Sequence, residues 1–287
     1  MKRVLITGAN SYIGESFEKW AKVKYPDQFQ IDTLDMIDKS WKKTNFSGYD
    51  VIFHVAGIVH RKECPEMKEL YYEVNTKLPV EIAIKAKKEE VKQFVFMSTM
   101  SVYGIDTGVI NKKTKPVPKT WYGKSKLKAE KELKRLEDRN FGVAIVRPPM
   151  VYGKDCKGNY ATLEKVALKI PVFPNIDNQR SMLYIDDLCE FLCLLMSKGG
   201  RDVYFPQNSE YVRTSDMVRI IAKKAGHPIW ISKVWCPVIW IAQRVPGKIS
   251  TLINKAFGNL VYDTNMSLEF KGEYQISHLE SSISGKE

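Results

Sequence analysis

The stretch RVLITGANSYIG, from Arg3 to Gly14, decides the fold of this 287-residue chain. Its apolar beginning, Arg3–Ile6, predicts a buried strand, and the residues from Ile13 to Lys24 predict a helix. A turn that contains glycine therefore joins a strand directly to a helix. Turns of this kind can present backbone N–H groups to a pyrophosphate at the helix N-terminus, so the stretch indicates a dinucleotide site.

Individual residues of the turn support this interpretation. Gly8 would permit the tight turn, and Gly14 would let the helix pack closely on the sheet. Ser11 stands where phosphate would approach most closely, and its hydroxyl could donate a hydrogen bond to a phosphate oxygen. Asp35 ends the next predicted strand, where a carboxylate would accept bonds from the adenosine ribose and favour NAD over NADP. Asp38 could serve instead.

The rest of the chain alternates between apolar strands and amphipathic helices. Strands are expected at 29–34, 51–55, 93–97, 143–146 and 203–205, and helices at 67–76, from 79 and at 122–138. This alternation predicts an α/β fold with a doubly wound parallel sheet covered by helices on both faces. We expect a dinucleotide-binding domain over 1–150, a smaller C-terminal substrate lobe over 151–276 interleaved with the last strands, and a polar, disordered tail at 277–287.

Composition excludes several classes of protein. The net charge of +12 would suit nucleic acid, but neither a groove-reading element nor an aromatic stacking platform is evident. The lysines of the predicted long helix alternate with glutamates, as on a solvated face. The five cysteines form no zinc pattern, so we expect reduced thiols and no metal. With no leader pattern and no apolar run long enough to span a bilayer, we expect a cytoplasmic protein.

A Trp-rich stretch, Pro228–Ala242, allows two interpretations. It could be a helix tucked into the core, or a basic membrane-surface contact. We favour the first, because Pro237 and Lys233 interrupt the apolar run. We therefore expect Trp235 and Trp240 to be mostly buried.

Tyr122 and Lys126 stand one helical turn apart in WYGKSK. A phenol and an ammonium on one helix face can interact, and the cation would lower the pKa of the tyrosine towards neutrality. Such a tyrosine can exchange a proton with a carbinol oxygen while hydride moves to or from a nicotinamide. Upstream, a strand runs into Ser98 and Thr99, and we expect Thr99 to hold the reacting oxygen beside Tyr122.

These motifs occur together in a known superfamily. TGANSYIG, HVAG (54–57), the Asn75 of YYEVN, STMSVYG, YGKSK and RPPMVYG stand in the order and spacing of the extended short-chain dehydrogenase/reductases. The chain resembles the nucleotide-sugar epimerases, dehydratases and 4-ketoreductases among them from Val4 to about Phe270. The resemblance is strongest to bacterial capsule UDP-sugar 4-ketoreductases of the UDP-N-acetylfucosamine-forming type, and it implies a Rossmann fold.

The resemblance also implies roles for particular residues. The catalytic hydroxyl, phenol and amine fall on Thr99, Tyr122 and Lys126. Thr99 is preferred to Ser98 or Ser101 because it lies four residues before the tyrosine of VYG. The cofactor contacts that are implied are Gly8, Asn10, Ser11, Tyr12, Ile13, Gly14, Asp35, Val55, Ala56, Gly57, Asn75, Ser98, Tyr122, Lys126 and Pro149. The substrate contacts are His60, Thr99, Met150, Asn159 and Arg180, and the Arg180 guanidinium would suit a UDP diphosphate.

Some residues depart from the family's patterns, and these departures favour a 4-ketoreductase over a dehydratase or a 4-epimerase. Met100 and Ser101 stand where the dehydratases have Asp-Glu, so dehydration is not expected. Pro149 and Met150 replace an asparagine-containing segment of the 4-epimerases, which favours reduction of a UDP-2-acetamido-2,6-dideoxy-4-hexulose with NAD(H) in polysaccharide biosynthesis. NADP remains an alternative cofactor.

The alternatives are a UDP-glucose or UDP-N-acetylglucosamine 4-epimerase and, more remotely, a non-catalytic NAD-sensing protein. The UDP-sugar is the only partner the resemblance implies. A homodimer stays open, because the sequence carries no information on oligomeric state.

Overall fold

The computed structural model describes residues 1–59, 64–244, 247–266 and 268–284. It divides into two compact units, each built from separate stretches of the chain. The first unit comprises 1–104, 115–148 and 185–206, and the second comprises 105–114, 149–184 and 207–287. The chain passes from the first unit to the second between residues 148 and 149, close to the expected boundary near 150. It also enters the second unit briefly at 105–114 and returns to the first unit over 185–206.

The first unit is built on a six-stranded sheet in the order β10-β6-β4-β3-β1-β2, with every neighbouring pair parallel. This confirms the predicted parallel sheet. The strands are β1 (Lys2–Thr7), β2 (Phe29–Leu34), β3 (Val51–His54), β4 (Gln93–Met97), β6 (Gly142–Val146) and β10 (Val203–Tyr204). All residues of β3, β4 and β6 are buried, as expected of central strands with both faces covered.

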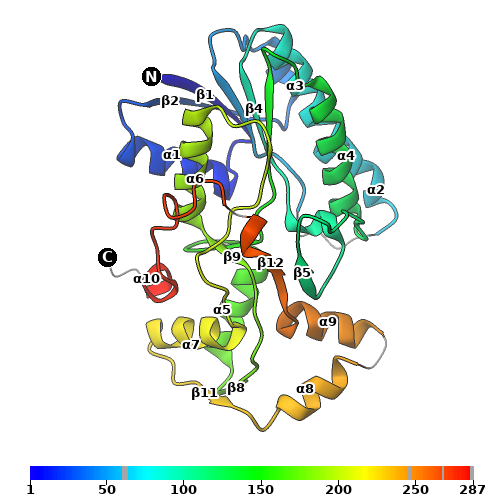
Figure 1. Cartoon of the computed structure of the whole chain (residues 1–287), viewed down its shortest axis with the longest axis vertical. Coiled ribbons are helices and arrows are strands. Elements are labelled where there is room, and N and C mark those ends of the chain that lie inside the picture. The colour runs from blue at the N-terminus through cyan, green and yellow to red at the C-terminus, as the bar shows by residue number, and fades with distance from the viewer. Residues whose placement is uncertain (60–63, 245–246, 267, 285–287) are drawn as a thin grey trace. The chain divides into compact units, whose positions relative to one another are not determined.

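Helices cover both faces of this sheet (Figure 1). They are α1 (Tyr12–Lys24), α2 (Met67–Tyr72), α3 (Leu78–Lys88), α4 (Trp121–Leu136) and α6 (Ile185–Lys198). Ile52 of β3 joins a core cluster with Ile82 of α3 and Leu133 of α4. The next residue, Phe53, packs edge-on against Phe17 of α1, with ring centroids 5.2 Å apart. Adjacent strand residues thus face opposite helical layers.

The helix predicted over 67–76 is divided in the structure into α2 and a π-helical turn. After α2 the chain forms a π-helical turn, η2 (Glu73–Lys77), which holds Asn75 fully buried. A π-turn widens a helix by one residue and is often found at functional sites. Two further short helical turns in this unit are η1 (Lys39–Lys43) and η3 (Met100–Tyr103).

The second unit has three two-stranded parallel sheets, which pair β5 with β12, β7 with β9, and β8 with β11. Its strands are β5 (Gly108–Ile110), β7 (Met150–Tyr152), β8 (Val172–Pro174), β9 (Met182–Tyr184), β11 (Trp230–Ser232) and β12 (Leu260–Tyr262). Its helical elements are α5 (Asn159–Lys169), α7 (Thr214–Lys224), α8 (Cys236–Ala242), α9 (Lys248–Phe257), η4 (Thr264–Met266) and α10 (Leu279–Ser284). A separate hydrophobic core joins α5 to α7.

Two expectations for the C-terminal part are wrong. The stretch expected to be a disordered tail contains α10, because its Ile283 is buried in the core of the second unit and its Leu279 packs against that core. Trp235 and Trp240 are 54% and 57% exposed, and α8 has no buried residue. The short α8 lies on the surface instead of being tucked into the core.

Candidate functional site

The turn after β1 closes in a conformation that requires glycine. Gly8 has a φ of +129°, and its N–H donates to the Leu34 carbonyl oxygen at 2.9 Å. A Cβ on Gly8 would lie 2.6 Å from the backbone nitrogen of Ala56. The turn therefore brings the ends of β1, β2 and β3 together, as a backbone cradle for a pyrophosphate needs. Asn10 adds a second left-handed residue, with φ +60°.

Ser11 is the N-cap of α1. Its hydroxyl oxygen accepts the Gly14 N–H at 3.2 Å, and its carbonyl oxygen accepts the Glu15 N–H at 2.9 Å. A Cβ on Gly14 would lie 2.6 Å from Ser11 Oγ and 3.2 Å from side-chain atoms of Ile6 and Val55. This confirms that Gly14 lets the helix approach the sheet. Serine at the middle position is compatible with the turn, because its hydroxyl caps the helix and keeps its own hydrogen as a donor.

The acids after β2 are both exposed and bonded to their own loop. Asp35 Oδ1 accepts the Ile37 N–H at 2.9 Å, and Asp38 caps η1 by accepting the Ser40 N–H at 2.8 Å. Hydrogen bonds from Ser40 lower the pKa of Asp38. Asp35 directly follows Leu34, the residue that pairs with the Gly8 turn, whereas Asp38 is engaged as a helix cap. Of the two acids, Asp35 is the better placed for a ribose.

The loop after β3 is held by Asn75. Its Oδ1 accepts the Ile58 N–H at 2.8 Å, and its Nδ2 donates to the Ile58 carbonyl oxygen at 3.0 Å and to Ser125 Oγ at 3.3 Å. A Cβ on Gly57 would lie 3.1 Å from Asn75 Oδ1 and 3.4 Å from Lys126 Nζ. Asn75 therefore fixes the loop through Gly57 beside the amine, and Ser125, which the sequence motifs did not single out, completes this contact.

Tyr122 and Thr99 meet where α4 begins. Thr120 caps α4 by accepting the Gly123 N–H at 3.1 Å. A Cβ on Gly123 would lie 2.7 Å from the Ser101 carbonyl oxygen, so glycine allows α4 to start close to η3. The Thr99 side chain lies near enough to the Tyr122 phenol to lower its pKa, and Thr99 Oγ1 also accepts the Ser101 N–H at 3.1 Å. The structure therefore brings the predicted hydroxyl and phenol close together.

The expected lowering of the Tyr122 pKa is wrong for this structure. Burial raises the pKa of Tyr122 to about 12, and the hydrogen bond from Thr99 only partly opposes this. Lys126 Nζ instead donates to the Met97 carbonyl oxygen at 2.8 Å and lies 4.5 Å from the centroid of the Phe96 ring. Burial lowers the pKa of Lys126 to about 8, with Glu130 opposing the shift. Desolvation outweighs the attraction that helix spacing alone suggested.

A buried ion pair supports these residues from behind. The carboxylate of Glu130 accepts bonds from Arg147 Nε at 3.0 Å and from the hydroxyl of Ser98. Arg147 Nη1 also donates to the Tyr103 hydroxyl at 2.9 Å. Glu130 stands one turn beyond Lys126 on α4, a spacing that could have indicated a role for it. Arg147 directly follows β6 and is the first residue of the RPPMVYG motif, but the motif by itself indicated no role for its guanidinium.

The predicted residues Tyr12 and Ile13 begin α1 in the first unit, and Pro149, Met150, Asn159 and Arg180 belong to the second unit. Pro149 is buried and Met150 begins β7. Asn159 is the exposed first residue of α5. Arg180 is half-buried, donates through Nη1 to the Gly258 carbonyl oxygen at 3.1 Å, and has a pKa that burial lowers while Asp106 opposes. His60 lies outside the described residues.

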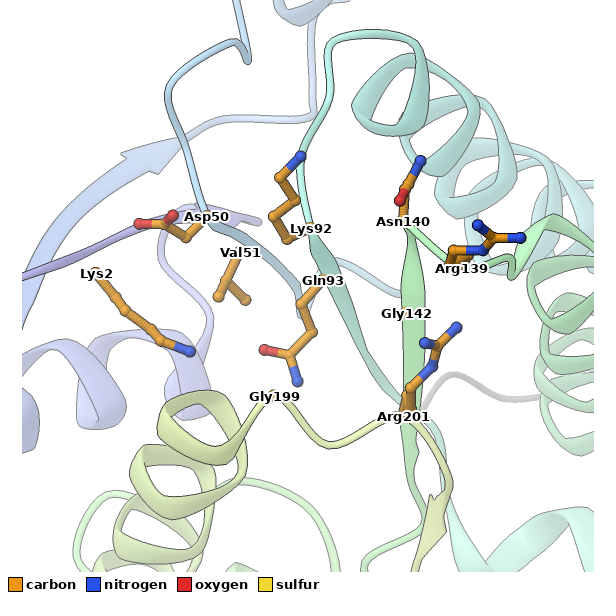
Figure 2. Close-up of a pocket in the computed structure, with 10 residues that line it drawn as sticks. All are labelled: Lys2, Asp50, Val51, Lys92, Gln93, Arg139, Asn140, Gly142, Gly199 and Arg201. Carbon is orange, nitrogen blue, oxygen red and sulfur yellow. The ribbon is translucent and has the colours of Figure 1, made fainter.

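A cavity of about 400 Å³ lies at the other edge of the sheet (Figure 2). Its lining includes the first residues of four strands: Lys2 of β1, Val51 of β3, Gln93 of β4 and Gly142 of β6. The motif residues follow the ends of these same strands. The cavity is therefore separate from the candidate site, and the motifs gather at the carboxyl edge, where open α/β sheets bind ligands.

The described residues fit a dinucleotide. Added Cβ atoms at Gly8 and Gly14 would collide with protein atoms, and the helix N-terminus behind Ser11 supplies N–H groups at the turn. Among the described residues, no group of three or more potential metal ligands comes together. No helix of the described part is long and apolar enough to cross a membrane.

Comparison with known proteins agrees with this geometry. The profile of the NAD dependent epimerase/dehydratase family matches residues 4–204. A UDP-glucose 4-epimerase of Vibrio cholerae is 28% identical over 94% of this chain and 90% of its own length. An N-acetyl-alpha-D-glucosaminyl-diphospho-ditrans,octacis-undecaprenol 4-epimerase of Escherichia coli O157:H7 is 27% identical over 70% of this chain and 66% of its own length.

Solved structures share the fold at low sequence identity. A dTDP-4-dehydrorhamnose reductase of Clostridium acetobutylicum superposes with a TM-score of 0.75 and 20% identity, covering 99% of this chain and 97% of its own. A UDP-glucuronic acid 4-epimerase of Bacillus cereus in complex with NAD superposes with a TM-score of 0.73 and 17% identity, with the same coverage.

Proposed function

Because this chain belongs to the NAD dependent epimerase/dehydratase family, we propose that it is an NAD-dependent 4-epimerase of a UDP-linked sugar. The observation that carries the proposal is that α4 places Tyr122 and Lys126 one turn apart, with the Thr99 side chain near enough to the phenol to lower its pKa. From the sequence motifs alone a 4-ketoreductase ranked first. The order changes because two relatives with extensive coverage are 4-epimerases.

Each residue of this group has a definite task in the proposed reaction. Tyr122 takes the proton of the C4 hydroxyl during oxidation and returns a proton to the C4 oxygen during reduction. Thr99 holds that oxygen beside the phenol, and the Lys126 ammonium lowers the free energy of the phenolate. Bound NAD supplies the hydride acceptor and the hydride donor at C4. The glycine turn and Asp35 bind the dinucleotide.

The substrate ligands on the second unit remain proposals. We assign Arg180 to the diphosphate, since a guanidinium bonds phosphate oxygens in bidentate fashion. The Arg180 guanidinium donates from Nη1 to the Gly258 carbonyl oxygen, and its other nitrogens can serve a ligand. Met150 and Asn159 of this unit are assigned to the sugar side of the substrate, and so is His60, which lies outside the described residues.

A 4-ketoreductase is the second candidate, and the protonated state of the Tyr122 phenol favours it. With a pKa raised to about 12, the phenol is protonated at neutral pH and is ready to act as an acid. Reduction of a 4-keto sugar needs only this proton-donating half of the cycle. Epimerisation also needs the phenolate as base, so bound cofactor or substrate has to lower the pKa of Tyr122.

Two assays on one protein sample distinguish the candidates. Proton NMR of UDP-glucose and UDP-N-acetylglucosamine would reveal interconversion with their C4 epimers without added reductant. Loss of NADH absorbance with a UDP-4-keto-6-deoxy sugar would reveal the reductase. Tyr122→Phe should lower turnover by about 10²–10⁴ in the active assay, the usual contribution of a positioned acid–base group.

The matched control for this experiment is Tyr49→Phe. It removes a phenol oxygen that donates to Asp32. Tyr49 precedes the amino end of β3, whereas the proposed site residues follow the carboxyl ends of strands, so the variant should keep full turnover. A Tyr122→Phe variant as active as this control would refute the mechanism. Activity of the native protein in the NADH assay alone would replace the epimerase by the reductase.

A further inference from the structure

The surface around α8 exposes large apolar side chains that the proposed function does not use. Trp230, Val234, Trp235, Val238, Trp240 and Ile241 are each between 54% and 75% exposed. Trp235, Val238 and Ile241 follow at three-residue spacing, so they share one side of the helix and its first turn. Soluble proteins rarely leave such a cluster in water, and a cluster of this kind marks an interaction surface. We call these six side chains the α8 surface.

The sequence around α8 carries charge of one sign. From residue 217 to residue 262 it contains no aspartate or glutamate, while Lys224, Lys233, Arg244, Lys248 and Lys255 are basic. Two further basic residues of this stretch, Arg219 and Lys223, pair with Asp216 and Glu280. Lys233 is exposed, and no acid pairs with Lys233 or Arg244 in the described part of the chain. The Arg244 guanidinium lies 3.5 Å from the centroid of the exposed Trp240 ring and donates to the Trp240 carbonyl oxygen at 2.9 Å. Unpaired cations thus border the indoles.

We propose that the α8 surface docks this protein onto a bilayer with anionic headgroups. Indole rings prefer the boundary between headgroups and acyl chains, because they combine an apolar body with an N–H donor. Lysine and arginine beside them would contact the anionic headgroups. α8 has only seven residues, with Pro237 in its first turn, and is too short to span a bilayer. We therefore expect it to lie on the membrane surface.

Charge complementarity favours an anionic bilayer over a second copy of this protein at the α8 surface. A second copy of the chain would place the same basic rim against itself, so the unpaired cations would repel one another. The interaction should therefore need both the indoles and the negative charge of the lipid. It should weaken with salt, because screening reduces the electrostatic part of the attraction.

Flotation of the full chain with vesicles tests the proposal. Vesicles of phosphatidylcholine with roughly a third phosphatidylglycerol should carry the protein upward at low salt, and pure phosphatidylcholine should carry much less. Lys233→Glu with Arg244→Glu should lower the bound-to-free ratio by more than about tenfold, because each basic side chain at an anionic surface contributes about fivefold. Trp235→Ser with Trp240→Ser should lower it at least as much.

Matched controls lie elsewhere on the chain. Ile37→Ser removes an apolar side chain that is 91% exposed on the first unit, and Lys112→Glu reverses an exposed charge that is distant from α8 in the sequence. Both should float like the native protein. All variants should keep the native thermal midpoint, since the side chains that are changed are on the surface.

Quenching of the native protein's tryptophan fluorescence by brominated lipid gives a second readout. Quenching should disappear when Trp230, Trp235 and Trp240 are replaced by phenylalanine. The proposal is overturned if native protein does not bind the anionic vesicles, or if the control variants lose binding equally. It is also overturned if light scattering shows a dimer that the Trp235→Ser, Trp240→Ser variant dissociates, because a second copy then occupies the surface.

Discussion

At the residue scale, burial changes the charge state of Lys126, a residue of the proposed site. Burial lowers its pKa to about 8, so the ammonium is present below that pH and is lost above it. If the charge stabilises the Tyr122 phenolate, turnover should fall as the pH rises through about 8. Lys126→Arg should be slower but should lack this fall, because a guanidinium stays charged.

A pH profile of turnover between about pH 6 and 10 measures this effect. Lys128→Arg, two residues further along α4 and exposed, is the control and should keep the native profile. A native profile that is flat across pH 8, or an equal fall in Lys126→Arg, would contradict the assignment.

Also at the residue scale, we expect Asp35 to make the protein prefer NADH to NADPH. Its exposed carboxylate directly follows the residue that pairs with the glycine turn, where it would repel a 2′-phosphate. NADH should therefore bind several-fold more tightly than NADPH in a fluorescence titration, and Asp35→Ala should narrow the difference. Asp38→Ala should leave the preference unchanged, because Asp38 is the cap of η1. Tighter binding of NADPH by the native protein would refute the role of Asp35.

At the element scale, the Glu130–Arg147 pair joins α4 to the end of β6. Both side chains are buried, at 3% and 9% exposure, so removing one leaves a buried charge without its partner. Glu130→Gln or Arg147→Met should each cost about 3–5 kcal/mol in urea unfolding. The double variant should cost less than the sum of the two, because no lone charge is left. Additive costs would show that the pair is not coupled.

Glu130 also raises the pKa of Lys126, which lies one turn away on α4, so the ion pair influences the charge of a site residue. In Glu130→Gln the fall in turnover with rising pH should move to lower pH. If Glu130 contributed only to stability, the pH at which turnover falls would be the same in Glu130→Gln and in the native protein.

At the scale of the whole molecule, the two compact units should respond differently to cofactor. The glycine turn, Asp35 and Lys126 all belong to the first unit. NAD at about 100 times its Kd should stabilise the protein by about 2.7 kcal/mol through mass action. Hydrogen exchange should slow mainly in 1–104, 115–148 and 185–206. Equal protection of the second unit by NAD alone would contradict a cofactor site confined to the first.

Local sequence determined the parallel sheet, the glycine turn and the positions of Thr99, Tyr122 and Lys126. Strand apolarity, glycine and helix spacing act between residues that are close in the chain. Only the tertiary structure decided the direction of the pKa shifts and the engagement of Asn75 with Ile58 and Ser125, because burial and long-range contacts depend on packing. The same holds for the exposure of α8, since apolar composition alone does not say which apolar side chains find a core.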